Sequence, residues 1–117
     1  MDKKTQQHQE KLYFAVENTL DAFYLSTGGG QIVYVNQSAC NALGYSYAEL
    51  TSMRTSDIDP TEVIQGDGTF TVGGMVLDRK HGVFESRHHR KDGSTFPVEV
   101  TYHNLTSEGV EYSCAYA

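Results

Sequence analysis

The sequence predicts an α+β domain in which short helices pack against one antiparallel sheet. Three features predict it: an amphipathic pattern at the N-terminus, strand-like runs near both ends of the chain, and short helix-compatible segments between them. A lone two-stranded hairpin is marginal in water, so strands from both ends of the chain are expected to share one sheet. The expected order is a helix, two strands, several short helices, and three strands in a meander.

The N-terminal segment has the pattern of an amphipathic helix. In residues 3–20, apolar side chains such as Leu12 and Val16 recur at helical spacing, with lysine, glutamate and glutamine on the other face. The first dozen residues are almost wholly polar, so this end of the helix is expected to project from the core. We therefore divide the chain into an N-terminal helical segment, residues 1–20, and a domain at residues 21–117.

Two strands are expected next, on either side of a glycine-rich link. Residues 22–26 and 32–36 are rich in apolar, aromatic and β-branched side chains, and residues 27–31 read Thr-Gly-Gly-Gly-Gln. A triple glycine can also cradle phosphate, but such loops lead from a strand into a helix. Here the glycines lead into a second strand, which favours a hairpin turn.

The middle of the chain carries two helix-start signals. Asn36 can cap a helix over residues 37–43, and Ser46 and Glu49 have the spacing of a capping box that starts a second short helix.

The segment that follows gives weaker signals. Residues 61–71 are polar and contain glycine, and they support no assignment. Residues 72–80 are interpreted as one more helix, although Gly73 and Gly74 weaken that interpretation.

The last third of the chain predicts a three-stranded meander with strands at residues 83–90, 95–105 and 110–117. Asp92 and Gly93 suit the positive φ values of a tight hairpin turn. In the middle strand, Val98, Val100 and Tyr102 alternate with polar residues, so one face of this strand is expected to be buried.

Composition restricts the partners and the compartment. A net charge of −6 disfavours nucleic acid as a partner, because phosphate contacts require clustered Lys and Arg. No apolar run approaches the roughly 20 residues that span a bilayer, so no membrane contact is expected. The two cysteines, Cys40 and Cys114, lie far apart in the sequence, which fits a reducing compartment, the cytoplasm.

Two longer stretches carry a family resemblance. Residues 30–50, which include Leu-Gly-Tyr-Ser-Tyr-Ala-Glu-Leu, resemble the first half of a PAS domain. Residues 84–100, in which Lys-Asp-Gly precedes Pro-Val-Glu-Val, are similar to the second half. The resemblance extends over residues 12–117 and implies the PAS fold, a five-stranded antiparallel sheet in the order 2-1-5-4-3 with helices on one face. Residues 61–82 match poorly, and in the family this region lines the ligand pocket.

The resemblance implies a sensory module of a bacterial signal-transduction protein. Such a module binds a small ligand, dimerises, or does both, and it regulates a linked effector. The effectors that the resemblance implies are a histidine kinase, as in two-component systems, or a diguanylate cyclase. Family members continue into that output domain, so we expect it to lie beyond residue 117.

No catalytic or metal site is expected. The five histidines are His8, His81, His88, His89 and His103. His88 and His89 are adjacent on a strand and must point to opposite faces, so they do not readily share a metal. No nucleophile motif accompanies them, and we expect a binding module rather than an enzyme.

Cofactors are left unassigned. Flavin photoadduct members of the family carry a cysteine after the short helices, and residues 53–57 contain none, while Cys40 lies earlier and is interpreted as structural. Haem members carry an axial histidine on the later helix. His81 falls near the end of the expected helix, so a haem is possible there, but a solvated histidine is the favoured interpretation.

The pocket and the dimer contact are predicted from alternation and amphipathicity. The side chains expected to line the pocket are Phe23, Tyr24, Tyr34, Met75, Phe84, Val98, Val100, Tyr102 and Tyr112. Leu12 and Val16 are expected to contact a second copy of the chain in a homodimer. Two alternatives remain: a ligand-free domain that serves only as a dimerising spacer, and, less favoured, a small α+β enzyme.

Overall fold

One five-stranded antiparallel sheet organises the protein. The computed structural model describes residues 2–117, and its strand order is β2-β1-β8-β7-β6. The strands are β1 (Phe23–Thr27), β2 (Ile32–Val35), β6 (His81–His89), β7 (Thr95–Ser107) and β8 (Val110–Tyr116). Numbered by order within this sheet, they follow the expected 2-1-5-4-3 arrangement, so the predicted fold is confirmed.

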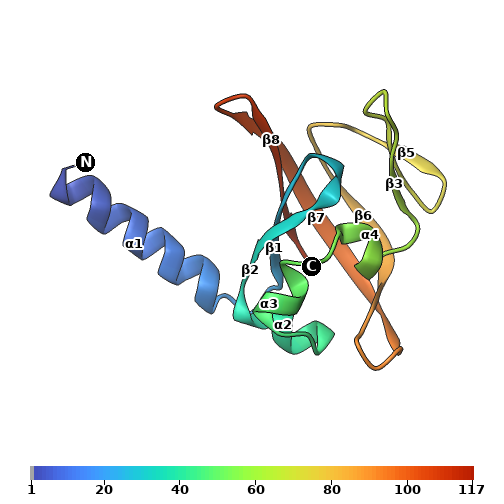
Figure 1. Cartoon of the computed structure of the whole chain (residues 1–117), viewed down its shortest axis with the longest axis horizontal. Helices are drawn as coiled ribbons and strands as arrows, with labels where there is room; N and C mark the ends of the chain where they lie inside the picture. The colour runs from blue at the N-terminus through green and yellow to red at the C-terminus, as the bar shows by residue number, and fades with distance from the viewer. Residues whose placement is uncertain (1) are drawn as a thin grey trace.

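The helices occupy the connection between β2 and the second half of the sheet, and one helix precedes the sheet. They are α1 (Lys3–Asn18), α2 (Gln37–Leu43), α3 (Tyr47–Leu50) and α4 (Thr55–Ile58), with a short 3-10 turn, η1 (Gly28–Gly30), between β1 and β2. Figure 1 shows α2, α3 and α4 grouped beside the sheet and α1 projecting away from it. No helix among residues 2–117 is long and apolar enough to cross a membrane.

The core lies between the short helices and one face of the sheet, here called the inner face. Tyr24 and Val35 are cross-strand partners on this face, and both are buried. Along β7 the predicted alternation is confirmed: Val100 and Tyr102 are buried, while Thr101 and His103 between and beyond them are exposed. The buried side chains packed together at the centre are Ala22, Tyr24, Ile32, Val35, Ala39, Cys40, Leu43, Leu50 and Ile58.

The side chain of Asn36 joins α1, β1 and α2. As predicted, it caps α2: its Oδ1 accepts a hydrogen bond from the Ala39 N–H at 3.0 Å. The same oxygen accepts from the Phe23 N–H at 2.9 Å. Its Nδ2 donates to the carbonyl oxygens of Val16 and Asp21, each at 2.9 Å. A fully buried side chain with four hydrogen bonds fixes how the chain passes from α1 into the sheet.

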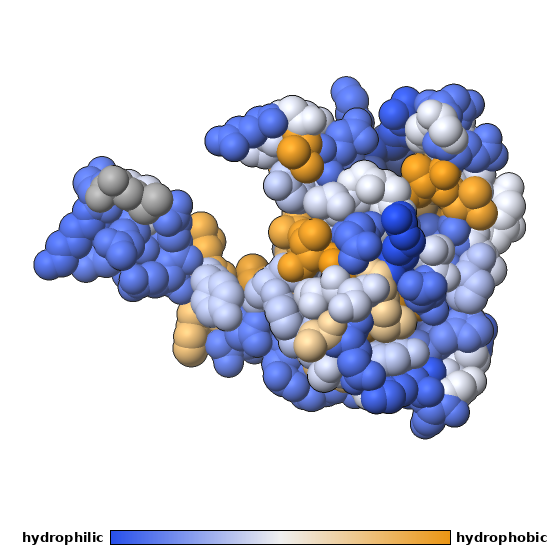
Figure 2. All heavy atoms as spheres, viewed as in Figure 1, coloured by the Kyte–Doolittle hydropathy of each residue, from blue (hydrophilic) through white to orange (hydrophobic). Residues whose placement is uncertain are grey.

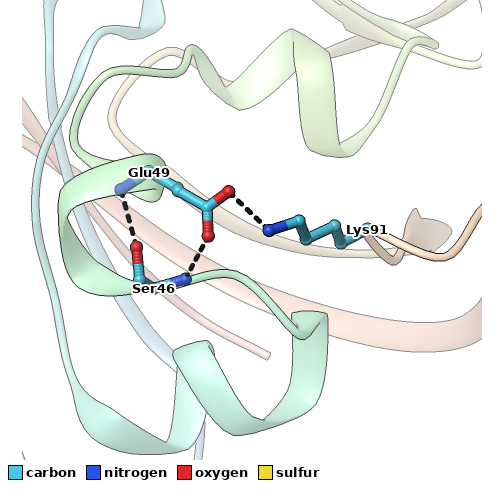
Figure 3. Close-up of polar contacts among 3 residues, drawn as sticks. All are labelled: Ser46, Glu49 and Lys91. Atoms are coloured by element: carbon cyan, nitrogen blue, oxygen red, sulfur yellow. Dashed lines mark hydrogen bonds and ion pairs between the residues drawn. The ribbon is translucent and has the colours of Figure 1, made fainter.

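The capping box of α3 also fastens the β6–β7 hairpin to the helices (Figure 3). The Ser46 hydroxyl accepts from the Glu49 N–H at 3.1 Å, and Glu49 Oε1 accepts from the Ser46 N–H at 3.0 Å. The other carboxylate oxygen of Glu49 pairs with Lys91 Nζ at 2.7 Å. In addition, the Lys91 N–H donates to the carbonyl oxygen of Leu43, at the end of α2.

The helix expected at residues 72–80 does not form, and that expectation is wrong. A second, three-stranded sheet takes its place, formed by β3 (Glu62–Ile64), β4 (Phe70–Val72) and β5 (Met75–Leu77). Gly73 and Gly74 have φ values of +57° and +81° and form the two-residue turn between β4 and β5. Two adjacent glycines adopt positive φ readily and stabilise a helix poorly, so the hairpin wins at this position.

Candidate ligand cavity

A cavity of about 630 Å³ opens between the inner face of the large sheet and the small β3–β5 sheet. The large sheet contributes Tyr24, Ser26, Phe84, Val100 and Tyr102 to its walls. The small sheet and its turns contribute the opposite wall, with Ile64, Gly68 and Phe70. Figure 1 shows the ribbon of β3 and β5 standing apart from that of β6 and β7.

A smaller chamber of about 40 Å³ lies among the same side chains, deeper toward the helices. Its polar lining residues are Tyr24, Thr55, Glu62 and His88. Its apolar lining residues are Ile32, Ile58, Phe84, Val100 and Ala115. Tyr24, Thr55, Glu62, Phe84, Val100 and Ala115 line the wide cavity as well, so the two spaces share one wall.

Two buried polar groups in the chamber have no partner. The Tyr24 hydroxyl and the Nδ1 atom of His88 are buried, and neither has a hydrogen bond within residues 2–117. The two residues are 5% and 8% exposed, and their rings meet edge to face with centroids 6.0 Å apart. An unsatisfied buried polar group costs about 1–3 kcal/mol, so such groups call for a ligand or water that supplies the missing bonds.

Burial also shifts the proton equilibria in the chamber. It lowers the pKa of His88, which the nearby Asp59 partly offsets, and it raises the pKa of the Tyr24 hydroxyl. Burial raises the pKa of Glu62 too; the hydroxyl of Thr55 opposes that shift by donating to Glu62 Oε1 at 2.6 Å. At neutral pH the histidine is therefore an uncharged imidazole.

Asp59 supports the chamber from behind. Its carboxylate is 2% exposed and accepts three hydrogen bonds, two from Thr61, through its N–H and its hydroxyl, and one from the Ser86 hydroxyl at 2.6 Å. Because Ser86 lies on β6 and Asp59 follows α4, this carboxylate joins the small-sheet segment to the large sheet. Its negative charge lies close enough to act on the pKa values of both Glu62 and His88.

The small sheet is held over the cavity by an aromatic cluster. The Phe70 ring meets the rings of Phe84 and Tyr102 with centroids 6.2 Å and 5.5 Å away. The Tyr102 hydroxyl donates to the carbonyl oxygen of Asp78, just beyond β5. A Cβ atom at Gly82 would lie 2.8 Å from that hydroxyl oxygen, so the ring fits only against a glycine.

Five of the nine side chains expected in the pocket line the wide cavity: Tyr24, Phe84, Val100, Tyr102 and Tyr112. Phe23 and Tyr34 lie instead on the other, outer face, where their rings contact each other. Met75 is exposed beside the β4–β5 turn, and Val98 lies further along β7, outside the lining.

Several residues that line the cavity or the chamber are not among the nine side chains predicted from the sequence. The most important are Thr55, Glu62 and His88. For His88 a signal was present: Phe84, Ser86 and His88 alternate along β6 and must share a face. For Glu62 and Thr55 no local signal exists. Glu62 is placed by the pairing of β3 with β4, and Thr55, at the start of α4, donates to its carboxylate.

The remaining histidines do not converge on the chamber. His81 lies exposed at the start of β6, not at the end of a helix, so the helical position considered for a haem ligand does not exist. His81 and His103 are cross-strand neighbours with stacked rings.

The N-terminal helix leaves apolar side chains uncovered. None of its residues is buried, and Leu12, Tyr13 and Phe14 are each more than 60% exposed. Val16 is half-buried, and Leu20, just after the helix, is 96% exposed. In Figure 2 the apolar colour on this helix gathers on the part nearer the sheet, while the far end is hydrophilic.

Comparison with known proteins identifies the family. The family model of the PAS domain matches residues 20–115. A search of curated proteins found no match. Among solved structures, the PAS domain of a two-component sensor histidine kinase is 21% identical, with 96% of each chain covered and a TM-score of 0.78.

Two further solved structures are similar. The PAS domain of an HTR-like protein from Haloarcula marismortui is 26% identical, with 97% of this chain and 93% of that chain covered and a TM-score of 0.73. The PAS domain of nitrogen regulation protein NR(II) from Vibrio parahaemolyticus is 14% identical, with 88% and 92% covered and a TM-score of 0.60.

Proposed function

The chain belongs to the PAS domain family, and from this premise we propose that it is a sensory module that takes a small molecule into the cavity between its two sheets. The observation that carries the proposal is the cavity itself: about 630 Å³, within the range of small-molecule sites, and continuous with buried polar groups that lack partners. Occupation of the cavity changes the packing of the inner face, and β1 and β8 transmit that change toward α1.

The route from cavity to helix is short in the fold. Tyr24 lines the cavity, and the N–H of its neighbour Phe23 donates to Asn36 Oδ1. The Nδ2 group of Asn36 in turn donates to the carbonyl oxygen of Val16 in the last turn of α1. A ligand that shifts β1 therefore alters the anchor of α1.

The test is ligand-dependent stabilisation. Small molecules below about 1 kDa, extracted from the cells that make this protein, should raise the Tm of the wild-type domain, because a ligand that binds only the folded state stabilises it by mass action. Ser26→Phe, which places a ring into the cavity from a buried position, should abolish the rise. An equal rise in both proteins, or none in either, refutes the proposal.

A second role, dimerisation through α1, is favoured by the uncovered apolar side chains of that helix. Leu12, Tyr13 and Phe14 are large and exposed, and a helix with uncovered apolar side chains gains stability by packing against a partner. Two copies of α1 side by side would cover these residues and place the following domains in parallel.

Light scattering tests the dimer. The wild-type mass should be that of a dimer, and it should fall to that of a monomer when residues 1–11 are removed or when Leu12 and Val16 are replaced by glutamate. Replacing the exposed Lys4 by glutamate, at the polar end of the helix, should leave the mass unchanged. A monomeric wild type at high concentration contradicts this role.

We propose further that the module regulates a linked histidine kinase or diguanylate cyclase in the cytoplasm. The free thiols of Cys40 and Cys114 suit a reducing compartment. In the full-length protein, ligand-dependent autophosphorylation from ATP would identify the kinase, and ligand-dependent formation of cyclic di-GMP the cyclase. If neither activity responds to the ligand while the dimer persists, the domain is a dimerising spacer.

A further inference from the structure

The chamber between Tyr24, Glu62 and His88 has the chemistry of a site for a positively charged nitrogen. We propose that the ligand is an organic cation, a primary amine with an apolar body, whose ammonium group enters this chamber and whose body fills the wider cavity. The inference rests on the proposed function, in which the cavity takes up a small molecule, and it names the class of that molecule.

The chamber presents hydrogen-bond acceptors in the number that an ammonium group needs. Glu62 Oε2, the Tyr24 hydroxyl oxygen and His88 Nδ1 each have no hydrogen-bond partner within residues 2–117. An uncharged imidazole accepts at Nδ1 when its proton is on Nε2, and burial keeps His88 uncharged at neutral pH. A primary ammonium has three N–H donors and no acceptor, so it matches these three atoms.

The charge of the chamber excludes anions and favours cations. None of the nine chamber-lining residues is a lysine or an arginine. Glu62 has no ion-pair partner among the described residues 2–117, in which the one salt bridge joins Lys91 and Glu49. The carboxylate of Asp59, behind the chamber, adds a second negative charge. Glu62 is half-buried, and a carboxylate that is partly removed from water is stabilised by a counter-ion, which a bound cation supplies.

The size of the chamber fits the head group and not the whole ligand. A volume of about 40 Å³ is close to the roughly 30 Å³ that one water molecule occupies in the liquid, and an ammonium group is of similar size. The rings of Tyr24 and Phe84 line the chamber, and aromatic faces attract a desolvated cation.

The wider cavity sets the character of the rest of the ligand. Its walls include the rings of Phe70, Phe84 and Tyr102, which suit an apolar or aromatic body. Arg79 and Lys80 line this cavity but not the chamber, so the positive end of the ligand must point inward, away from them.

Three probes of one shape and different charge test the inference. They are 2-phenylethylamine, which is a cation at pH 7, 2-phenylethanol, which is neutral, and 3-phenylpropionate, which is an anion. Calorimetric titration measures their affinities, and the NMR shifts of Tyr24, Phe84 and His88 report whether each probe occupies the cavity. The variants are Glu62→Gln, which keeps the shape and the Thr55 contact, and Glu99→Gln, an exposed glutamate on the outer face of β7, as the matched control.

We expect the amine to bind at least tenfold more tightly than the other two probes, since a charged hydrogen bond contributes about 1.5–3 kcal/mol and 1.4 kcal/mol is tenfold. Glu62→Gln should weaken the amine at least tenfold, and Glu99→Gln should leave it unchanged. Equal or tighter binding of the alcohol or the propionate in the cavity overturns this inference and leaves the proposed function standing. If no probe shifts the cavity resonances, the inference is overturned, and if the cell extract also leaves the Tm unchanged the proposed function falls with it.

Discussion

Replacing Asn36 by alanine removes four hydrogen bonds at the junction of α1, β1 and α2. The side chain is fully buried, and its two atoms serve the Ala39 and Phe23 N–H groups and the Val16 and Asp21 carbonyl oxygens. Each of these backbone groups must then find water or remain unpaired. The variant therefore tests whether this one residue attaches the N-terminal helix to the PAS core.

The expected loss in the free energy of unfolding follows from those contacts. Loss of a helix N-cap costs about 1 kcal/mol. Leaving the buried Phe23 N–H without an acceptor costs about 1–3 kcal/mol. The two carbonyl oxygens lie nearer the surface and add less, because water reaches them. Asn36→Ala should thus lose about 3 kcal/mol, which for a domain of this size lowers the Tm by roughly 10–15 °C.

Urea unfolding followed by circular dichroism measures the loss, with two comparisons. Asn36→Ser keeps a hydroxyl that can cap α2 but cannot reach α1, so it should recover about 1 kcal/mol. Asn41→Ala, at an exposed position of α2, should change stability by less than about 0.5 kcal/mol. If Asn36→Ala is as stable as the Asn41 variant, the junction is held by other contacts and the reasoning is refuted.

Three further changes have distinct expected outcomes. Gly82→Ala should destabilise the domain by about 1–3 kcal/mol in urea unfolding, because its Cβ would lie 2.8 Å from the Tyr102 hydroxyl; a wild-type midpoint would show that the ring moves freely. Glu62→Gln should be more stable than the wild type at pH 7 and equal to it below about pH 4, because burial raises the carboxyl pKa above 4.5 and stability is lost as pH rises through the raised value. A variant less stable than the wild type at pH 7 would mean that the charged carboxylate is stabilised in the fold. Lys91→Met should lower the urea midpoint only slightly, and by less in 1 M NaCl, because its pairing with Glu49 is exposed to solvent; a large, salt-independent loss would contradict this.

The parts of the fold that the sequence predicted are those that local chemistry decides. Asn36 and the Ser46–Glu49 pair start helices because their side chains cap neighbouring N–H groups, whatever the rest of the chain does. The alternation around Val100 and Tyr102 identified the buried face of β7 for the same reason.

The small sheet does not follow from the sequence, because the apolar pattern of residues 72–80 is compatible with both a helix and a hairpin. In residues 72–80, Val72, Met75 and Val76 fit helical spacing, but they also flank a two-residue glycine turn. Gly73 and Gly74 disfavour a helix, and their positive φ values instead form the turn of a hairpin. A short apolar run fits the period of a helix and that of a strand equally well, so the two adjacent glycines are the feature that favours the hairpin.

The polar end of the cavity could not be derived from local patterns. Tyr24 lies on β1 and His88 on β6, far apart in the sequence, and Glu62 lines the same chamber from β3, a segment without a local signal. Side chains along a strand alternate between the two faces of the sheet, and the pairing register with the neighbouring strand decides which of them face inward. In the β7–β8 pair, the register places Ala115 opposite Tyr102 on the inner face. Such choices depend on tertiary pairing, which the sequence pattern leaves open.

Native mass spectrometry of the protein, purified without denaturation and recorded beside its absorption spectrum, tests the central claim that the cavity holds a small molecule. The account predicts an additional mass of a small molecule on the wild-type protein, absent from Ser26→Phe. The apo mass alone on the wild type, even after incubation with the extract of small molecules, would contradict it.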